Sequence, residues 1–117
     1  MSSPHTLLNP PAGLRLVALE YFPAADDAPA GWYCQDSHGL PVLGVAFDAK
    51  FGKTHVVTPY SAGTMRADID AGDIVDALVE ADGRVLFDGE GYADLDALTD
   101  WMTSYRQRAQ VRKARTA

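Results

Sequence analysis

Between residues 14 and 22, apolar side chains occupy both alternating sets of positions. Neighbouring side chains of a β-strand point to opposite faces, so this pattern predicts a strand that is covered on both sides. Shorter apolar runs follow at residues 32–35, 42–47 and 54–58, and turn-forming residues separate them. We expect these three runs to pair as an antiparallel meander.

Two interpretations are open for residues 73–82. The apolar run 74–79 precedes Asp82 and Gly83, and Asp-Gly between apolar runs is a strong hairpin signal, so the run predicts a strand paired with residues 84–87. The same run also fits a short helix that Asp73 would cap and Gly83 would terminate. We favour the strand.

The clearest periodicity lies near the C-terminus, where Asp94 or an adjacent residue is expected to cap a helix. Its apolar residues recur every three or four positions, which is typical of a helix that packs one face on a sheet. These residues are Leu95, Leu98, Met102, Tyr105 and Ala109. The apolar face ends there, so the final turn is expected to leave the body of the domain or to fray.

Together these elements predict an α+β fold, with an antiparallel sheet of five or six strands covered by one C-terminal α-helix. Residues 1–13 contain three prolines and are expected to form an extended arm. Residues 14–110 are expected to form one domain and residues 111–117 a basic tail. Residues 61–72 have no clean period, which favours an irregular loop that is either mobile or functional.

Composition narrows the class of protein. The 47% hydrophobic and 22% charged fractions are typical of a folded globular domain. Cys34 is the only cysteine, so an internal disulfide is excluded and a reducing compartment fits best. Because neither a leader pattern nor an apolar run of about 18 residues is present, we expect a cytoplasmic protein without a membrane partner. The excess of Ala, Asp and Arg suggests a bacterial or phage origin.

Charge is divided unevenly along the chain. Residues 1–100 hold all sixteen acidic residues and five of the ten basic ones, a net charge of −11, whereas residues 101–117 carry +5. Acidic surfaces repel nucleic acid and attract basic proteins. We therefore favour a small acidic, non-enzymatic binding protein that engages a basic patch on a protein partner, as inhibitors and immunity proteins do. The candidate partner-binding residues are Asp68, Asp70, Asp73, Asp76, Glu80 and Asp82.

The basic end of the last helix carries two alternative hypotheses. It would bind the phosphate backbone of a nucleic acid, because clustered cations release counterions on binding. It would equally join the acidic body of a second copy and give a homo-oligomer. The candidate residues for both are Arg106, Arg108, Arg112, Lys113 and Arg115.

A small enzyme with a Cys/His site is the remaining alternative. If the meander forms, Cys34, His38 and His55 would meet near Asp36 as a nucleophile pair or as zinc ligands. The spacing from Cys34 to His38 is not usual for zinc, and a lone cysteine in a strand is usually a small buried hydrophobe. The Asp68-to-Asp73 segment does not match the register of a calcium loop. We expect no metal and no cofactor, and we favour a non-enzymatic protein.

Overall fold

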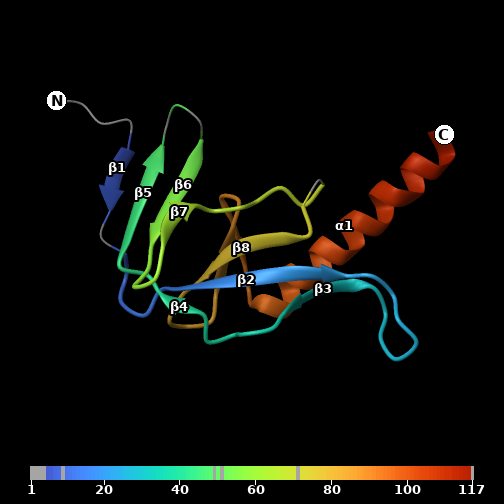
Figure 1. Ribbon diagram of the computed structural model, residues 1–117, viewed down its shortest axis with the longest axis horizontal. Coiled ribbons are helices and arrows are strands. Elements are labelled where there is room, and N and C mark those ends of the chain that lie inside the picture. The colour runs from blue at the N-terminus through green and yellow to red at the C-terminus, as the bar shows by residue number, and fades with distance from the viewer. Residues whose placement is uncertain (1–4, 9, 49, 51, 71, 117) are drawn as a thin grey trace.

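The computed structural model describes the backbone of residues 5–8, 10–48, 50, 52–70 and 72–116. It is an α+β structure in which two antiparallel sheets and one helix, α1 (Leu95–Thr116), form three layers (Figure 1). The predicted fold class is therefore confirmed. A second sheet was not expected.

The larger sheet has six strands and lies in the middle. Its order is β10-β9-β8-β2-β3, and β4 also pairs with β2. The central pair is β2 and β8, which align over six residues from Arg15 opposite Val79 to Glu20 opposite Ile74. The strands are β2 (Arg15–Phe22), β3 (Gly31–Cys34), β4 (Leu40–Pro41), β8 (Ile74–Val79), β9 (Val85–Phe87) and β10 (Glu90–Tyr92).

The smaller sheet has four strands in the order β1-β5-β6-β7. It packs against the side of the six-stranded sheet that faces away from α1, so that β2 and β8 run from this sheet toward the helix (Figure 1). The strands are β1 (His5–Leu8), β5 (Gly44–Asp48), β6 (Lys53–Val57) and β7 (Ala62–Thr64).

The main core lies between the six-stranded sheet and α1. Strand alternation directs Val17 and Leu19 of β2 and Val75 of β8 toward the helix, where they meet the fully buried Leu98 and Met102. Trp32 and Phe87 complete this layer. The predicted apolar face of the helix is therefore the face that docks on the sheet.

A second core lies between the two sheets. Leu14, just before β2, and Leu78 of β8 are buried against Val42 and Val56, and Leu16 and Leu86 pack around them. Side chains at alternating positions of β2 thus enter different cores. The prediction that this strand is covered on both sides is confirmed for its first half.

Helix α1 begins with the expected cap, because Asp94 Oδ1 accepts a hydrogen bond from the backbone N–H of Ala97 at 2.8 Å. The middle of the helix is tied to β3 and to the loop before β8. The Thr103 hydroxyl accepts a hydrogen bond from the Trp32 N–H at 3.1 Å. The C-terminal end projects beyond the sheet (Figure 1) and remains helical to Thr116, so the basic residues 111–116 continue the helix.

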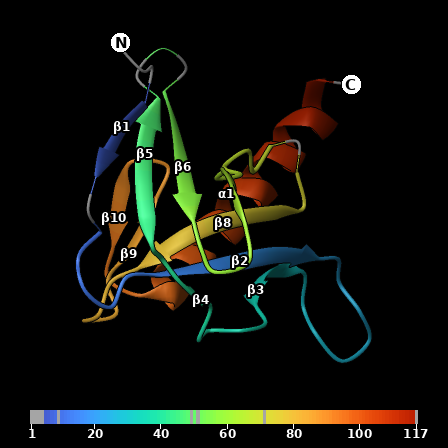
Figure 2. The same ribbon diagram turned by 60° about the vertical axis from the view of Figure 1, so that its left-hand side comes forward.

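The expected meander is confirmed for its second and third runs and wrong for its first. The runs predicted at 42–47 and 54–58 form β5 and β6, which pair as antiparallel neighbours, whereas residues 31–34 form β3 and pair with β2 in the other sheet (Figure 2). All three segments have strand-like patterns. What separates them is the turn at 35–39 and the short strand β4, which direct the chain from one sheet to the other.

Residues 74–79 form strand β8, which confirms the strand interpretation over the helix. Its hairpin partner β9 follows the Asp82-Gly83 turn as predicted, and β10 was missed. The turn before β10 has positive φ at both Asp88 (51°) and Gly89 (80°), the conformation that Asp-Gly favours in tight hairpins. Residues 5–8 are extended as expected but pair with β5, and the loop predicted at 61–72 includes β7.

The helix–sheet core sets the stability of the fold. We expect Leu98→Ala to lower the free energy of unfolding by about 2–5 kcal/mol, because the fully buried side chain leaves a cavity. Val111→Ala on the same helix is the control, since Val111 is 52% exposed and should change stability by less than about 0.5 kcal/mol. Urea unfolding monitored by circular dichroism measures both, and equal effects would contradict this packing.

Candidate functional site

The six-stranded sheet is only partly covered on its outer face, by which we mean the face opposite α1. Strand register divides that face into rows. One row, formed by Leu86, Leu78, Leu16 and Leu40, lies under the four-stranded sheet. Farther along β2 and β8, a second row formed by Ile74, Glu20 and Tyr33 remains open; Ile74 and Tyr33 are each 40% exposed.

A cleft of about 700 Å³ lies where the covered and open parts of the outer face meet. Its floor is formed by Ala18 and Glu20 of β2 with Ile74 and Asp76 of β8. One wall is the segment 61–66, which contains β7, and the opposite wall is the turn between β3 and β4. The irregular segment at 61–72 therefore contributes one whole wall of the candidate site.

The β7 wall is an edge strand, the last in the order of its sheet. The turn that leads into it is held by the buried Thr58, whose hydroxyl accepts hydrogen bonds from the N–H groups of Tyr60 and Ser61 at 3.2 and 3.1 Å. This side chain–backbone contact fixes the direction in which β7 starts. The edge is thus positioned by a buried residue rather than by the exposed turn itself.

An ion pair holds the other end of the same wall. Arg66 donates to Asp76 from Nε at 3.0 Å and from Nη2 at 2.9 Å, and the Arg66 N–H donates to the same carboxylate at 2.9 Å. The Asp76 N–H in turn donates to the Arg66 carbonyl. The hydrogen bonds to Asp76 raise the pKa of Arg66 above its usual value. These contacts pair the backbone N–H of Asp76 at the edge of β8, and they connect the 61–66 wall of the cleft to its floor.

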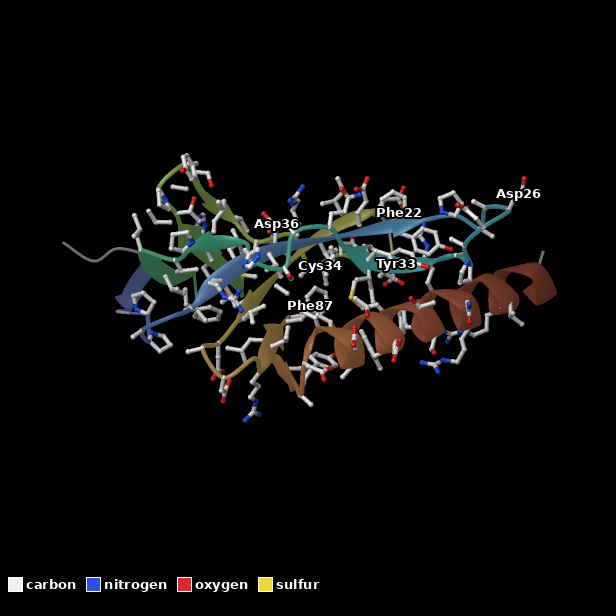
Figure 3. The ribbon with its side chains drawn as sticks, turned by 90° about the horizontal axis from the view of Figure 1, so that it is seen from below. Phe22, Asp26, Tyr33, Cys34, Asp36 and Phe87 are labelled. Atoms are coloured by element: carbon white, nitrogen blue, oxygen red, sulfur yellow. The ribbon has the colours of Figure 1, made fainter. Side chains whose placement is uncertain are left out.

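The charge of the cleft is predominantly negative. Glu20, Asp36 and Asp76 line it, against the single cation Arg66. Asp36 Oδ1 accepts hydrogen bonds from the N–H groups of His38 and Gly39, which orients the carboxylate at the start of the turn. Figure 3 places Asp36 on the side of β2 and β3 that faces away from α1. Sequence reasoning missed Glu20, although the alternation of β2 places it opposite the helix-facing Leu19 and Tyr21, and it placed Asp36 beside the Cys/His residues rather than in an acidic cleft.

The predicted acidic set does not form one patch, because β8 separates its members. Asp68, Asp70 and Asp73 precede β8, and Glu80 and Asp82 follow it at the opposite end. Asp76 lies between them, only 8% exposed and paired with Arg66. Of the six residues, Asp76 lines the cleft.

The predicted basic set is also divided. Arg106 is held against the body of the protein: its Nη2 lies 2.9 Å from Asp73 Oδ1, and its guanidinium lies 3.8 Å from the centre of the Tyr21 ring. Beside it, the Tyr105 hydroxyl donates to Asp70, a contact that raises the pKa of Tyr105. Arg108 and Arg112 are exposed farther along α1, and the side chains of Lys113 and Arg115 lie outside the described residues.

The Cys/His constellation does not converge. Cys34 lies on β3 with its side chain packed toward α1 (Figure 3), whereas His55 lies on β6 of the other sheet, with Nε2 3.1 Å from the Thr64 hydroxyl. His38 follows in the turn after β3. The expectation that these residues meet depended on the meander, and it is wrong for the same reason. Burial raises the pKa of the Cys34 thiol, which disfavours a nucleophilic thiolate.

Within the part of the chain that the structure describes, no cluster of three or more His, Cys, Asp or Glu side chains could hold a metal ion. None of the helical residues described there forms a segment long and apolar enough to span a membrane. Comparison with protein-family models, curated proteins and solved structures finds no match to this chain. The cleft combines a concave surface, an excess of negative charge and an open strand edge, and we take it as the candidate functional site.

The position of Cys34 gives a testable pH dependence. Because burial favours the neutral thiol, the pH at which half of it is thiolate should be higher in the native protein than in the unfolded chain. The rate of reaction with a disulfide reagent, measured across pH 7–10, reports this midpoint. The same measurement in guanidinium provides the control, and a native midpoint at or below the unfolded one would contradict the placement of Cys34.

Proposed function

We propose that this chain is a small non-enzymatic binding protein that engages a positively charged surface of a protein partner through the cleft and the open outer face beside it. The observation that carries the proposal is the cleft of about 700 Å³, which is lined by three carboxylates and one guanidinium, and in which Arg66 pairs with Asp76 and leaves the charges of Glu20 and Asp36 in excess. A cleft of this volume is in the usual range for binding sites. An excess of carboxylates favours a partner that presents Lys or Arg.

The long-range electrostatic field of the protein also favours a basic protein as the partner. The body of the protein carries −11 up to residue 100, so a basic protein would be attracted before contact is made. Electrostatic complementarity of this kind raises association rates and discriminates against acidic partners. Nucleic acid would be repelled from the cleft by the same field.

Apolar contact area lies next to the charged cleft. Tyr33 and Ile74 flank Glu20 in the open row, and the Phe22 ring lies 6.0 Å from that of Tyr33. Tyrosine is enriched among residues that contribute most to protein–protein affinity, because it offers a large apolar area with few rotatable bonds. Charged residues for steering and apolar residues for affinity therefore occur side by side.

The basic end of α1 remains a second candidate surface for nucleic acid. The exposed Arg108 favours it, whereas Arg106 is already engaged with Asp73 and Tyr21. The acidic segment 68–73 also lies beside this part of the helix. We therefore favour a protein partner over nucleic acid.

The proposal is tested by capture of proteins from a nuclease-treated lysate of the source organism. The immobilised protein should retain a defined basic protein at about 0.05 M salt and release it at about 0.5 M, because exposed charge pairs are screened over that range. A Glu20→Gln, Asp36→Asn double variant should lose the same protein. The matched control is Asp26→Asn, Asp27→Asn, which removes two charges from the loop far from the cleft (Figure 3).

Two results would contradict the proposal. One is that the folded protein retains no specific protein at low salt. The other is that the cleft variant and the loop variant retain it equally, since the charge of the cleft would then be irrelevant. Capture from an untreated lysate that is lost when the lysate is treated with nuclease would point instead to nucleic acid and the basic helix end.

A further inference from the structure

The hydrogen-bonding pattern of β7 shows which of its backbone groups face away from β6. Two hydrogen bonds on the β6 side mark its ends: Met65 N–H donates to the Thr54 carbonyl at one end, and Thr58 N–H donates to the Ser61 carbonyl at the other. Hydrogen-bonded pairs alternate in an antiparallel ladder, so Gly63 is the residue of β7 that bonds to Val56. The N–H and C=O groups of Ala62 and Thr64 therefore point outward, toward the cleft.

Two outward-facing N–H groups of the six-stranded sheet are closed within the chain. The Trp32 N–H of β3 donates to the Thr103 hydroxyl of α1, and the Asp76 N–H of β8 donates to the Arg66 carbonyl. Across the described residues, no comparable hydrogen bond closes Ala62 or Thr64. Proteins usually protect an edge strand with charge, proline or a covering segment, whereas β7 is the exposed sequence Ala-Gly-Thr.

We infer that the cleft takes an extended, lysine- or arginine-bearing segment of the protein partner, which pairs with the β7 edge as a fifth strand of the smaller sheet. This mode of recognition uses the backbone for affinity and alternate side chains for specificity. The inference rests on the proposed function, because it names how the partner enters the same cleft. Its distinct content is the backbone pairing with Ala62 and Thr64.

The floor of the cleft determines which side chains the added strand would present. A strand beside β7 lies over the outer face of β2 and β8, because β7 and that face line the same cleft. Every second side chain of the added strand would point to the floor. Near Glu20 and Asp36 a Lys or Arg is favoured, and over Ala18 a small or apolar residue fits.

A synthetic peptide tests this mode directly. The probe is a fluorescein-labelled peptide of about seven residues, the length of an ordinary strand, in which lysine alternates with valine or threonine. It should bind the full chain in a fluorescence anisotropy titration at low salt. The same peptide with glutamate in place of lysine should not bind, because the cleft is acidic.

The decisive controls remove backbone hydrogen bonds and leave the charges unchanged. Two peptides methylated at alternate backbone nitrogens, one in each register, separate the two edges of the added strand: the one methylated on the nitrogens that face β7 should bind roughly tenfold more weakly because it loses donors to the edge, whereas the other keeps those donors and should bind as the unmethylated peptide does. Ala62→Pro should have a similar effect, because it removes an outward N–H that β6 does not use. Ala62→Ser retains that N–H and should therefore bind the peptide more tightly than Ala62→Pro does. Circular dichroism confirms that each variant is folded.

Three outcomes would overturn the inference. Unchanged binding of both methylated peptides would exclude backbone pairing, whatever the variants do. Absence of binding by any lysine peptide to the folded protein would exclude an extended basic segment, while specific capture of a folded basic protein would leave the proposed function intact. Light scattering that shows a dimer lost in Ala62→Pro, with no peptide binding, would assign the β7 edge to a second copy of this chain.

Discussion

The pairing of β2 with β8 is the interaction on which the rest of the structure depends. Its six-residue register sends Leu19 and Val75 to the helix side and Leu16 and Leu78 to the other side, so a single pair of strands contributes to both cores. A shift of one residue would exchange the two faces and place apolar side chains where Glu20 and Asp76 now lie. Each core therefore fixes the register that the other core also needs.

The cleft follows from a mismatch in length between the layers. β2 has eight residues and extends over about 26 Å, whereas the described strands of the smaller sheet have three to five residues. The smaller sheet therefore covers the leucine row and stops before Glu20. On the helix side, α1 packs Leu98 and Met102 on the sheet, and its middle is held by the contacts of Arg106 with Asp73 and Tyr21. The face of the six-stranded sheet toward α1 is therefore covered, whereas its outer face remains partly open.

Local sequence patterns were enough to predict many of the strands and turns, because the residues that form each pattern lie within a few positions of one another. The strand at 15–22, the hairpin across Asp82-Gly83 and the Asp94 cap all have this local origin. Which sheet each strand joins depends on contacts between distant segments, and residues 31–34 and 44–48 have equally strand-like patterns. The candidate site was harder still to predict. Charge density along the sequence indicated 68–82, but β8 divides that run, and Glu20 and Asp36 come together with the β7 edge only through the packing of the two sheets.

The central claim is that the open part of the outer face, bounded by the β7 edge, is the binding surface of this protein. Amide NMR spectra of the labelled protein, recorded as an alternating lysine peptide is added, test it most directly. If the peptide binds at this surface, the largest amide shifts should occur at residues 61–66, on β2 from Leu16 to Glu20, and at Asp36. Shifts confined to residues 104–112 of α1, with the β7 edge unchanged, would contradict it.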